Sequence, residues 1–181
     1  MKNFVFVFLI LLFATACREE KIKPLVTKDN IENEIPSHES WNSKITFSDN
    51  GKIKAILFTD HLKKYEEQKV TLLDGVKIDF YDTDQNKASV MTSLHGKVDD
   101  ATMNMYAIDN VVAENDSGTV LKTSELMWRN SDQKIITDKF VSIKSTKEVI
   151  EGYGMESDQS LRNYVIFNVT YSAAVNTKEN K

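Results

Sequence analysis

Residues 76–80 read Val76-Lys77-Ile78-Asp79-Phe80, three apolar side chains alternating with two charged ones. Successive side chains of an extended strand point to opposite faces, so this stretch predicts a half-buried β-strand. The same period of two recurs along the chain from Trp41 onward. The apolar residues that follow it, two positions apart, are Ile45 and Phe47; Ile53, Ala55 and Leu57; Met103, Met105 and Ala107; Val141 and Ile143; and Val165, Phe167, Val169 and Tyr171. The pattern predicts an all-β protein.

Turn signals separate these apolar runs. Asn50-Gly51, Asp74-Gly75 and Ser117-Gly118 each lie between two runs, and such pairs allow the positive φ angles of tight hairpin turns. No proline follows Pro36, as expected where strands need every amide donor. Residues 60–68 are the one exception to the strand pattern, because Asp60 could cap a short helix there.

A weak internal repeat, with an offset of about 30 residues, favours the same fold. Residues 90–94 are similar to residues 120–126, and residues 110–112 are similar to residues 140–143. Each of the two units is expected to be a pair of strands. Stacking such pairs edge to edge gives one long antiparallel sheet folded over a single core. We therefore predict a twisted antiparallel β-jelly roll or an open sandwich.

The N-terminus has the pattern of a bacterial secretory signal. Residues 1–16 contain Lys2, an apolar run and small residues just before the single cysteine, Cys17. As a helix, residues 4–16 would be about 20 Å long against about 30 Å of membrane hydrocarbon, too short to span. A lone exported cysteine can be a free thiol, an intermolecular disulfide partner or an acylation site, and its position favours acylation over a plain secretory signal.

The rest of the chain divides into three parts. Residues 17–40 carry both prolines and frequent charge without clear period, so an acylated Cys17 and a flexible tether are expected there. Residues 41–172 are long enough for one core and form the predicted jelly-roll domain. Residues 173–181 are expected to be a polar tail.

Composition excludes several functional classes. Without Lys2 the chain has 22 basic and 27 acidic residues, a formal charge of −5, which argues against a nucleic-acid partner. With only one cysteine, an intrachain disulfide and a Cys-based zinc cluster are impossible. The predicted domain therefore depends on its apolar core.

No catalytic or metal-binding pattern stands out. The histidines are His38 in the tether, His61 in the possible helix and His95 beside a glycine at an expected turn, so all three are interpreted as surface residues. Residues 82–86 imitate the opening of a calcium loop, but Lys87 stands where that loop needs glycine. We predict no enzyme, no cofactor and no metal, with an enzyme of unknown type as the remote alternative.

The remaining functional class is binding, and the sequence offers two kinds of binding site. Inward side chains could line a cavity for acyl chains instead of forming an ordinary core, which is the alternative for each of them. The candidates for lipid binding are Ile45, Phe47, Ile78, Phe80, Met103, Met105, Trp128 and Val141. The second kind of site is a strand edge open to a partner's strand, because residues 164–171 carry no protective charge. A central strand is the alternative there.

From about Trp41 to Tyr171 the order of these features resembles the LptC family, the periplasmic component of the lipopolysaccharide export transporter. The likeness is carried by short segments in succession. They are Asp49-Asn50-Gly51, residues 55–61, residues 75–81, Asn110-Val111, residues 121–128, Ile136-Thr137-Asp138, Phe140-Val141 and residues 151–154.

The resemblance implies a jelly roll that accepts lipopolysaccharide from an inner-membrane ABC transporter and passes it to an LptA-like periplasmic bridge protein, without catalysis. The C-terminal edge would meet the bridge protein. Candidate residues for that contact are Gly152 and Gly154, in a glycine-bearing turn before the last strand, with Val165, Phe167 and Val169 on the strand itself.

The anchor differs from that of many family members, which keep a transmembrane helix where this chain has an apolar run and Cys17. The expected location is the periplasm, with a lipid anchor in the inner membrane. Arg18-Glu19-Glu20 resembles a signal that sends some lipoproteins outward, so outward sorting stays open. A structural envelope lipoprotein that scaffolds partners through its strand edges, without lipid transfer, is the rival hypothesis.

Overall fold

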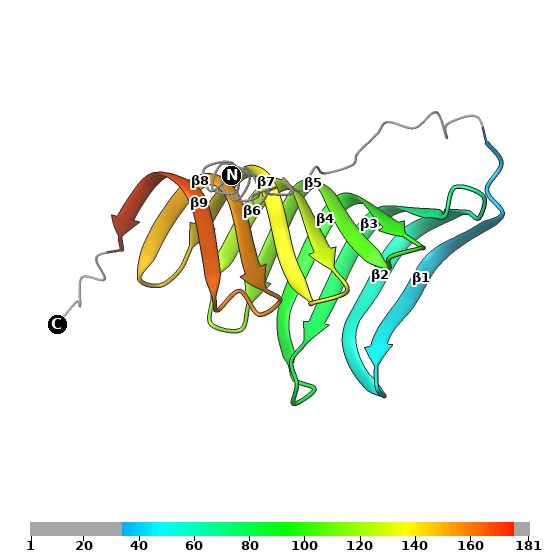
Figure 1. Cartoon of the computed structure of the whole chain (residues 1–181), viewed down its shortest axis with the longest axis horizontal. Helices are drawn as coiled ribbons and strands as arrows, with labels where there is room; N and C mark the ends of the chain where they lie inside the picture. The colour runs from blue at the N-terminus through cyan, green and yellow to red at the C-terminus, as the bar shows by residue number, and fades with distance from the viewer. Residues whose placement is uncertain (1–33, 176–181) are drawn as a thin grey trace, which may run out of the picture.

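The computed structural model of the chain describes residues 34–175, and every regular element in this range is a β-strand (Figure 1). The strands are β1 (His38–Asp49), β2 (Lys52–Tyr65), β3 (Val70–Tyr81), β4 (Lys87–Asp99), β5 (Asn104–Asn115), β6 (Val120–Arg129), β7 (Lys134–Lys144), β8 (Glu148–Asp158) and β9 (Tyr164–Ala174). They form one sheet in which each strand pairs antiparallel with the next. The prediction of an all-β jelly roll or open sandwich is confirmed.

The ends of the chain lie outside this range. The expected signal peptide, the acylation of Cys17 and most of the tether fall on residues 1–33, and most of the polar tail falls on residues 176–181. The sheet itself begins at His38 and ends at Ala174, slightly beyond the expected domain limits. The described residues contain no helix long and apolar enough to cross a membrane.

A line of irregular residues across the sheet lets the strands bend while keeping apolar side chains inside. In β3, the buried positions are the odd-numbered Thr71 and Leu73 before the bend, and the buried apolar side chains are even-numbered from Val76, with Gly75 between them at φ 63°. From the β4–β5 ladder onward, every ladder has a register shift near its middle. A bulge of this kind adds a residue and bends the strand, so both halves present apolar side chains to the same interior.

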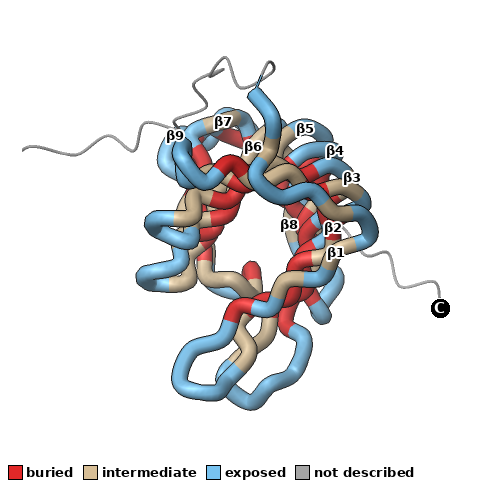
Figure 2. Tube along the Cα trace, turned by 90° about the vertical axis from the view of Figure 1, so that its right-hand side faces the viewer, coloured by how far each residue is buried: buried red, intermediate tan, exposed pale blue. Residues whose placement is uncertain are grey.

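The core joins strands that are far apart in the sheet. Trp128 of β6 contacts Phe47 of β1 with ring centroids 5.9 Å apart, and Phe80 of β3 at 6.0 Å. In a flat sheet β1 and β6 would be about 24 Å apart, at roughly 4.8 Å per strand. The sheet is therefore folded over one core. Viewed along its long axis, the trace surrounds an interior lined by buried residues (Figure 2).

Several local predictions are correct. Asn50-Gly51 forms the β1–β2 turn with both φ angles positive, and Ser117-Gly118 lies in the β5–β6 turn. The repeat units correspond to two hairpins, β4–β5 and β6–β7. The calcium-like residues 82–86 are a polar hairpin connection, in which the Asp82 side chain accepts hydrogen bonds from the Asp84 and Asn86 amides.

Others are wrong, and the bend explains most of them. Asp74-Gly75 is a mid-strand bulge, because a bulge and a turn need the same positive φ at glycine. Residues 60–65 continue β2. The inward-facing positions change parity after Asp60, so the sequence of the whole strand does not show one regular period of two. His95, Gly152 and Gly154 also lie within strands, not in turns. His38 begins β1, and Met103 lies in the β4–β5 turn.

The β8–β9 loop, residues 159–163, crosses to distant strands and fastens the roll. The Gln159 side chain donates a hydrogen bond to the Tyr81 carbonyl, and the Ser89 hydroxyl donates to the Gln159 carbonyl. Arg162 pairs with Asp116 at 2.6 Å. Leu161 is almost fully buried in the common core. The loop thus ties the β8–β9 hairpin to β3, β4 and the β5–β6 turn.

Asp158 holds this loop in shape, which gives it a pH dependence. Burial acts to raise the pKa of Asp158, but hydrogen bonds from the Ser160 and Asn163 side chains and from the Arg162 amide outweigh burial and lower it. A lowered folded-state pKa means that the carboxylate stabilises the fold above its unfolded pKa, about 3.9. That contribution is lost as the pH falls through the folded-state value.

We therefore expect Asp158→Asn to lower the melting temperature at pH 7 and to matter progressively less below about pH 4. Thermal unfolding of both proteins across this range measures it. A difference in melting temperature that stays constant down to pH 2.5, about a unit and a half below the unfolded pKa, would contradict the assigned role.

Candidate functional site

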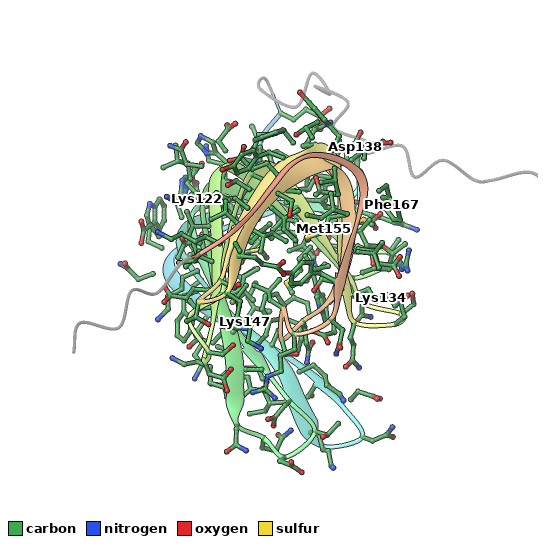
Figure 3. The ribbon with its side chains drawn as sticks, turned by 90° about the vertical axis from the view of Figure 1, so that its left-hand side faces the viewer. Lys122, Lys134, Asp138, Lys147, Met155 and Phe167 are labelled. Carbon is green, nitrogen blue, oxygen red and sulfur yellow. The ribbon has the colours of Figure 1, made fainter. Side chains whose placement is uncertain are left out.

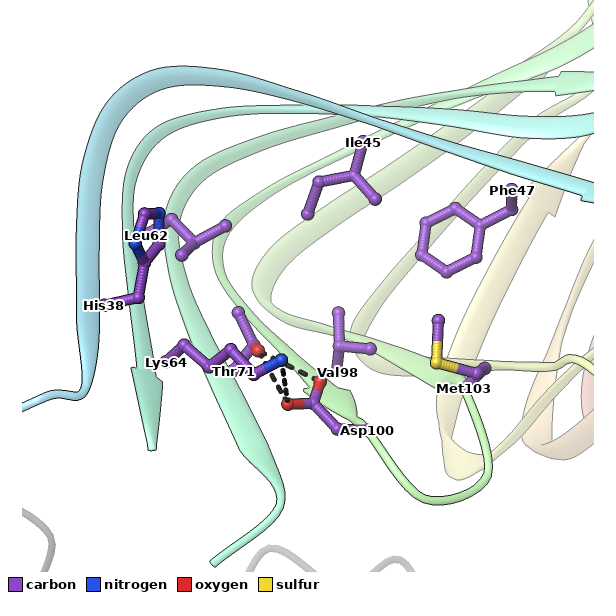
Figure 4. Close-up of a pocket in the computed structure, with 9 residues that line it drawn as sticks. All are labelled: His38, Ile45, Phe47, Leu62, Lys64, Thr71, Val98, Asp100 and Met103. Carbon is purple, nitrogen blue, oxygen red and sulfur yellow. Dashed lines mark hydrogen bonds and ion pairs between the residues drawn. The ribbon is translucent and has the colours of Figure 1, made fainter. Parts of the chain in front are cut away.

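An apolar cavity of about 290 Å³ lies at the β1 end of the roll (Figure 4). Its lining comes from β1 to β4 and the β4–β5 turn. The lining residues are His38, Ile45, Phe47, Leu62, Lys64, Thr71, Val98, Asp100 and Met103. Five of these nine are apolar, and they come from strands that the bend brings to face one another. The cavity can accept a hydrocarbon group without repacking of the whole core.

Polar groups are confined to one side of this cavity. Lys64 Nζ lies 3.6 Å from Asp100 Oδ2, and the Thr71 hydroxyl donates to the same carboxylate at 3.0 and 3.2 Å (Figure 4). The Lys64 and Asp100 side chains remain partly exposed to solvent. An amphiphile could therefore place its hydrocarbon against Ile45 and Phe47 while its polar part stays beside these charges.

The predicted lipid-binding residues divide into three groups. Phe47, Ile78, Phe80, Met105, Trp128 and Val141 are buried together in the core cluster. Ile45 packs against that cluster, while Met103 is 39% exposed. Among the predicted residues, Ile45, Phe47 and Met103 line the cavity. Their role in binding remains a prediction.

Sequence reasoning missed six lining residues: His38, Leu62, Lys64, Thr71, Val98 and Asp100. Leu62 and Lys64 were hidden by the helix expected at residues 60–68. Val98 follows Gly96 on the inner face of β4, beyond the bend, where the earlier alternation no longer applies. A search that allowed one change of phase per strand would have found Leu62, Thr71 and Val98.

At the opposite end, β9 is an edge strand, which decides between the two alternatives for residues 164–171. The exposed fractions are 59% for Val165, 61% for Phe167 and 55% for Val169. Figure 3 shows Phe167 on the outer side and Met155, which is fully buried, inside the roll. Such an uncharged and exposed edge is suited to pairing with another strand.

Two glycines of β8 fix the position of this edge strand. A Cβ atom at Gly152 would lie 2.4 Å from the Asn168 carbonyl oxygen and 2.7 Å from Ile166. Gly154 has φ +74°, and a Cβ there would lie 3.0 Å from the Phe167 ring. Gly152 and Gly154 thus permit the close approach of β9, so their candidate role in partner binding would be indirect.

A larger cavity of about 810 Å³ lies beside β9, and most of the residues that line it are polar or charged. Its lining includes Lys134, Glu148, Glu156 and Arg162, and Lys134 pairs with Glu156. Tyr164 OH donates to Glu148 at 3.3 Å, and burial together with this carboxylate raises the pKa of Tyr164. The two cavities therefore differ in their lining: mainly apolar residues at β1, and mainly polar and charged residues beside the uncharged strand β9.

Histidines take no part in a recognisable catalytic arrangement within residues 34–175. On the outer face, His61 contacts Glu39 at 2.7 Å, and His95 contacts Asp74 at 2.8 Å. His38 lines the apolar cavity. The described residues also contain no group of three His, Cys, Asp or Glu side chains placed to hold a metal ion.

Comparison with known protein families gives a match. A family model described as "Lipopolysaccharide-assembly, LptC-related" matches residues 5–170. No curated protein matches the chain. The match covers the whole sheet except its last few residues, including both the apolar cavity and the body of the edge strand.

Proposed function

Since the chain belongs to the LptC-related family of lipopolysaccharide-assembly proteins, we propose that it binds lipopolysaccharide in the periplasm and passes it on. In this proposal an inner-membrane ABC transporter delivers the lipid at the β1 end. An LptA-like bridge protein accepts it at the β9 end. Cys17 carries the acyl groups that hold the protein at the membrane.

The observation that carries the proposal is the apolar cavity at the β1 end of a roll whose other end is an uncharged edge strand. Acyl chains are expelled from water, and Ile45, Phe47 and Met103 offer them apolar contact. The polar part of the lipid stays beside Lys64 and Asp100. A bridge protein with a similar fold could extend the sheet by pairing with β9.

A photo-crosslinking amino acid at Ile45 tests this proposal. In cells, lipopolysaccharide is expected to label position 45 strongly, because this side chain faces the cavity. The matched control is Thr46, the next residue on β1, which is exposed and faces away. We expect at least about tenfold less labelling at position 46. Equal labelling at the two positions would refute lipid binding in the cavity.

The exposed edge also favours the rival function, a scaffold that holds envelope proteins together without carrying lipid. Pull-down of the membrane-bound protein separates the two. Recovery of the transporter and the bridge protein, together with labelling at position 45, supports lipid transfer. Recovery of other envelope proteins alone, without labelling, supports the scaffold.

A further inference from the structure

Trp128 carries a polar group that the core leaves without a partner. Its side chain is 0% exposed, and no acceptor among the described residues lies within hydrogen-bonding reach of the indole Nε1. The neighbouring Phe47 and Phe80 rings are at most weak acceptors for an N–H group. A buried donor without a partner costs the fold its desolvation penalty, and phenylalanine would avoid that cost.

Trp128 also lies directly behind the apolar cavity. Phe47 lines the cavity with its own ring and contacts the Trp128 ring on β6. Trp128 is not itself part of the cavity lining, so a hydrocarbon chain reaches it when the Phe47 ring moves aside.

The surroundings of Trp128 can adapt to such a chain. Met105 is the register partner of Trp128 on β5, and Met91 and Met155 are likewise buried in the same core. Methionine side chains are unbranched and flexible, so they repack at low cost around a ligand. The core that holds Trp128 thus contains side chains that can move.

We propose that the Trp128 indole N–H selects the ligand by donating a hydrogen bond to an oxygen atom carried on the acyl chain. The acceptor is a hydroxyl or an ester oxygen close to the polar end of the chain. An unsubstituted chain would fill the same space but leave the donor unpaired, so it binds more weakly. This inference rests on the proposed lipid-binding function and adds the chemical class of chain that the site prefers.

Three alkyl phosphates of equal chain length test the inference: one unsubstituted, one with a hydroxyl on the third carbon, and the acetate ester of that hydroxyl. The protein is the full chain with Trp41→Phe, in which Trp128 is the remaining tryptophan. Affinity and the fluorescence of Trp128 are measured together. We expect an oxygen-bearing chain to bind about tenfold more tightly and to shift the emission to the red, because its oxygen accepts from the indole N–H.

The two oxygen-bearing probes distinguish the acceptor. A preference confined to the hydroxyl probe assigns the bond to a hydroxyl oxygen, and one confined to the ester probe assigns it to an ester oxygen. In Trp128→Phe the oxygen-bearing probes are expected to bind about as tightly as the unsubstituted one, which still binds. The fluorescence measurement does not depend on that variant's folding.

Equal affinity for all three probes, with no emission shift, would overturn the role of Trp128 and leave the lipid site intact. Failure of every probe to bind would overturn the lipid site itself. The two failures are therefore distinguishable.

Discussion

Alanine at position 152 is expected to open the ladder between β8 and β9. The added Cβ would lie 2.4 Å from the Asn168 carbonyl oxygen, and both groups belong to paired backbones that cannot rotate away. The strands must separate or shift, at a cost of about 3 kcal/mol. Hydrogen exchange of the β9 amides should therefore accelerate by roughly a hundredfold, since about 1.4 kcal/mol corresponds to a factor of ten.

Gly118→Ala is the matched control for this variant. Gly118 also has a positive φ, +79°, but a Cβ there meets nothing within 4 Å. Its replacement should cost only about 1 kcal/mol of backbone strain and leave β9 protected. Equal protection of β9 in the two variants would show that close packing at Gly152 does not hold the edge strand.

The Gly152→Ala variant also tests the two ends of the proposed transfer route independently. If a bridge protein docks on β9, Gly152→Ala should lose it in pull-down experiments while position 45 is still labelled by lipopolysaccharide. Loss of both signals would mean that the whole fold has been disturbed. Retention of the bridge protein would place its docking site elsewhere.

Replacing Phe80 by alanine is expected to give the largest loss of stability, about 3 to 5 kcal/mol. Phe80 is 0% exposed and contacts Trp128 across the folded sheet, so its removal leaves a cavity where the two halves of the roll meet. Urea unfolding measures the loss directly.

Phe58 provides the comparison for that loss. It lies on the outer face of β2 between Lys44 and Lys77, whose ammonium groups are 5.9 and 5.5 Å from its ring. Phe58→Ala should cost about 1 kcal/mol, mainly through these cation–π contacts. Similar losses for Phe80→Ala and Phe58→Ala would contradict the assignment of Phe80 to the centre of the core.

The sequence predicted the strands well where the alternation keeps one phase and poorly where the chain bends. Residues 76–80 show the phase of the second half of β3, and Ile78 and Phe80 are indeed buried. At Asp60 and Gly75 the inward positions change parity, so the second half of β2 was interpreted as a helix and β3 as two strands joined by a turn. These residues have the composition of turns because bulges use the same backbone angles.

The candidate site could be predicted only in part, for a different reason. The cavity depends on Leu62, Val98 and Phe47 meeting across a folded sheet, and local alternation contains no information on that meeting. The edge was easier to recognise, because the absence of charge from Tyr164 to Tyr171 is a local property. Its place as the last strand followed only from the order of the whole sheet.

The strand order has a consequence for how the chain folds. Because every strand pairs with its predecessor, each ladder can close through a short turn at small entropic cost. A chain that emerges N-terminus first can then add one hairpin after another without waiting for its C-terminus. The hydrogen bonds of Gln159 and Ser89 join residues 78 and 70 positions apart, so they form only after this growth is complete. The contacts of the β8–β9 loop thus form last and close the roll. Chains that end before residue 159 should form their hairpins but lack this closure.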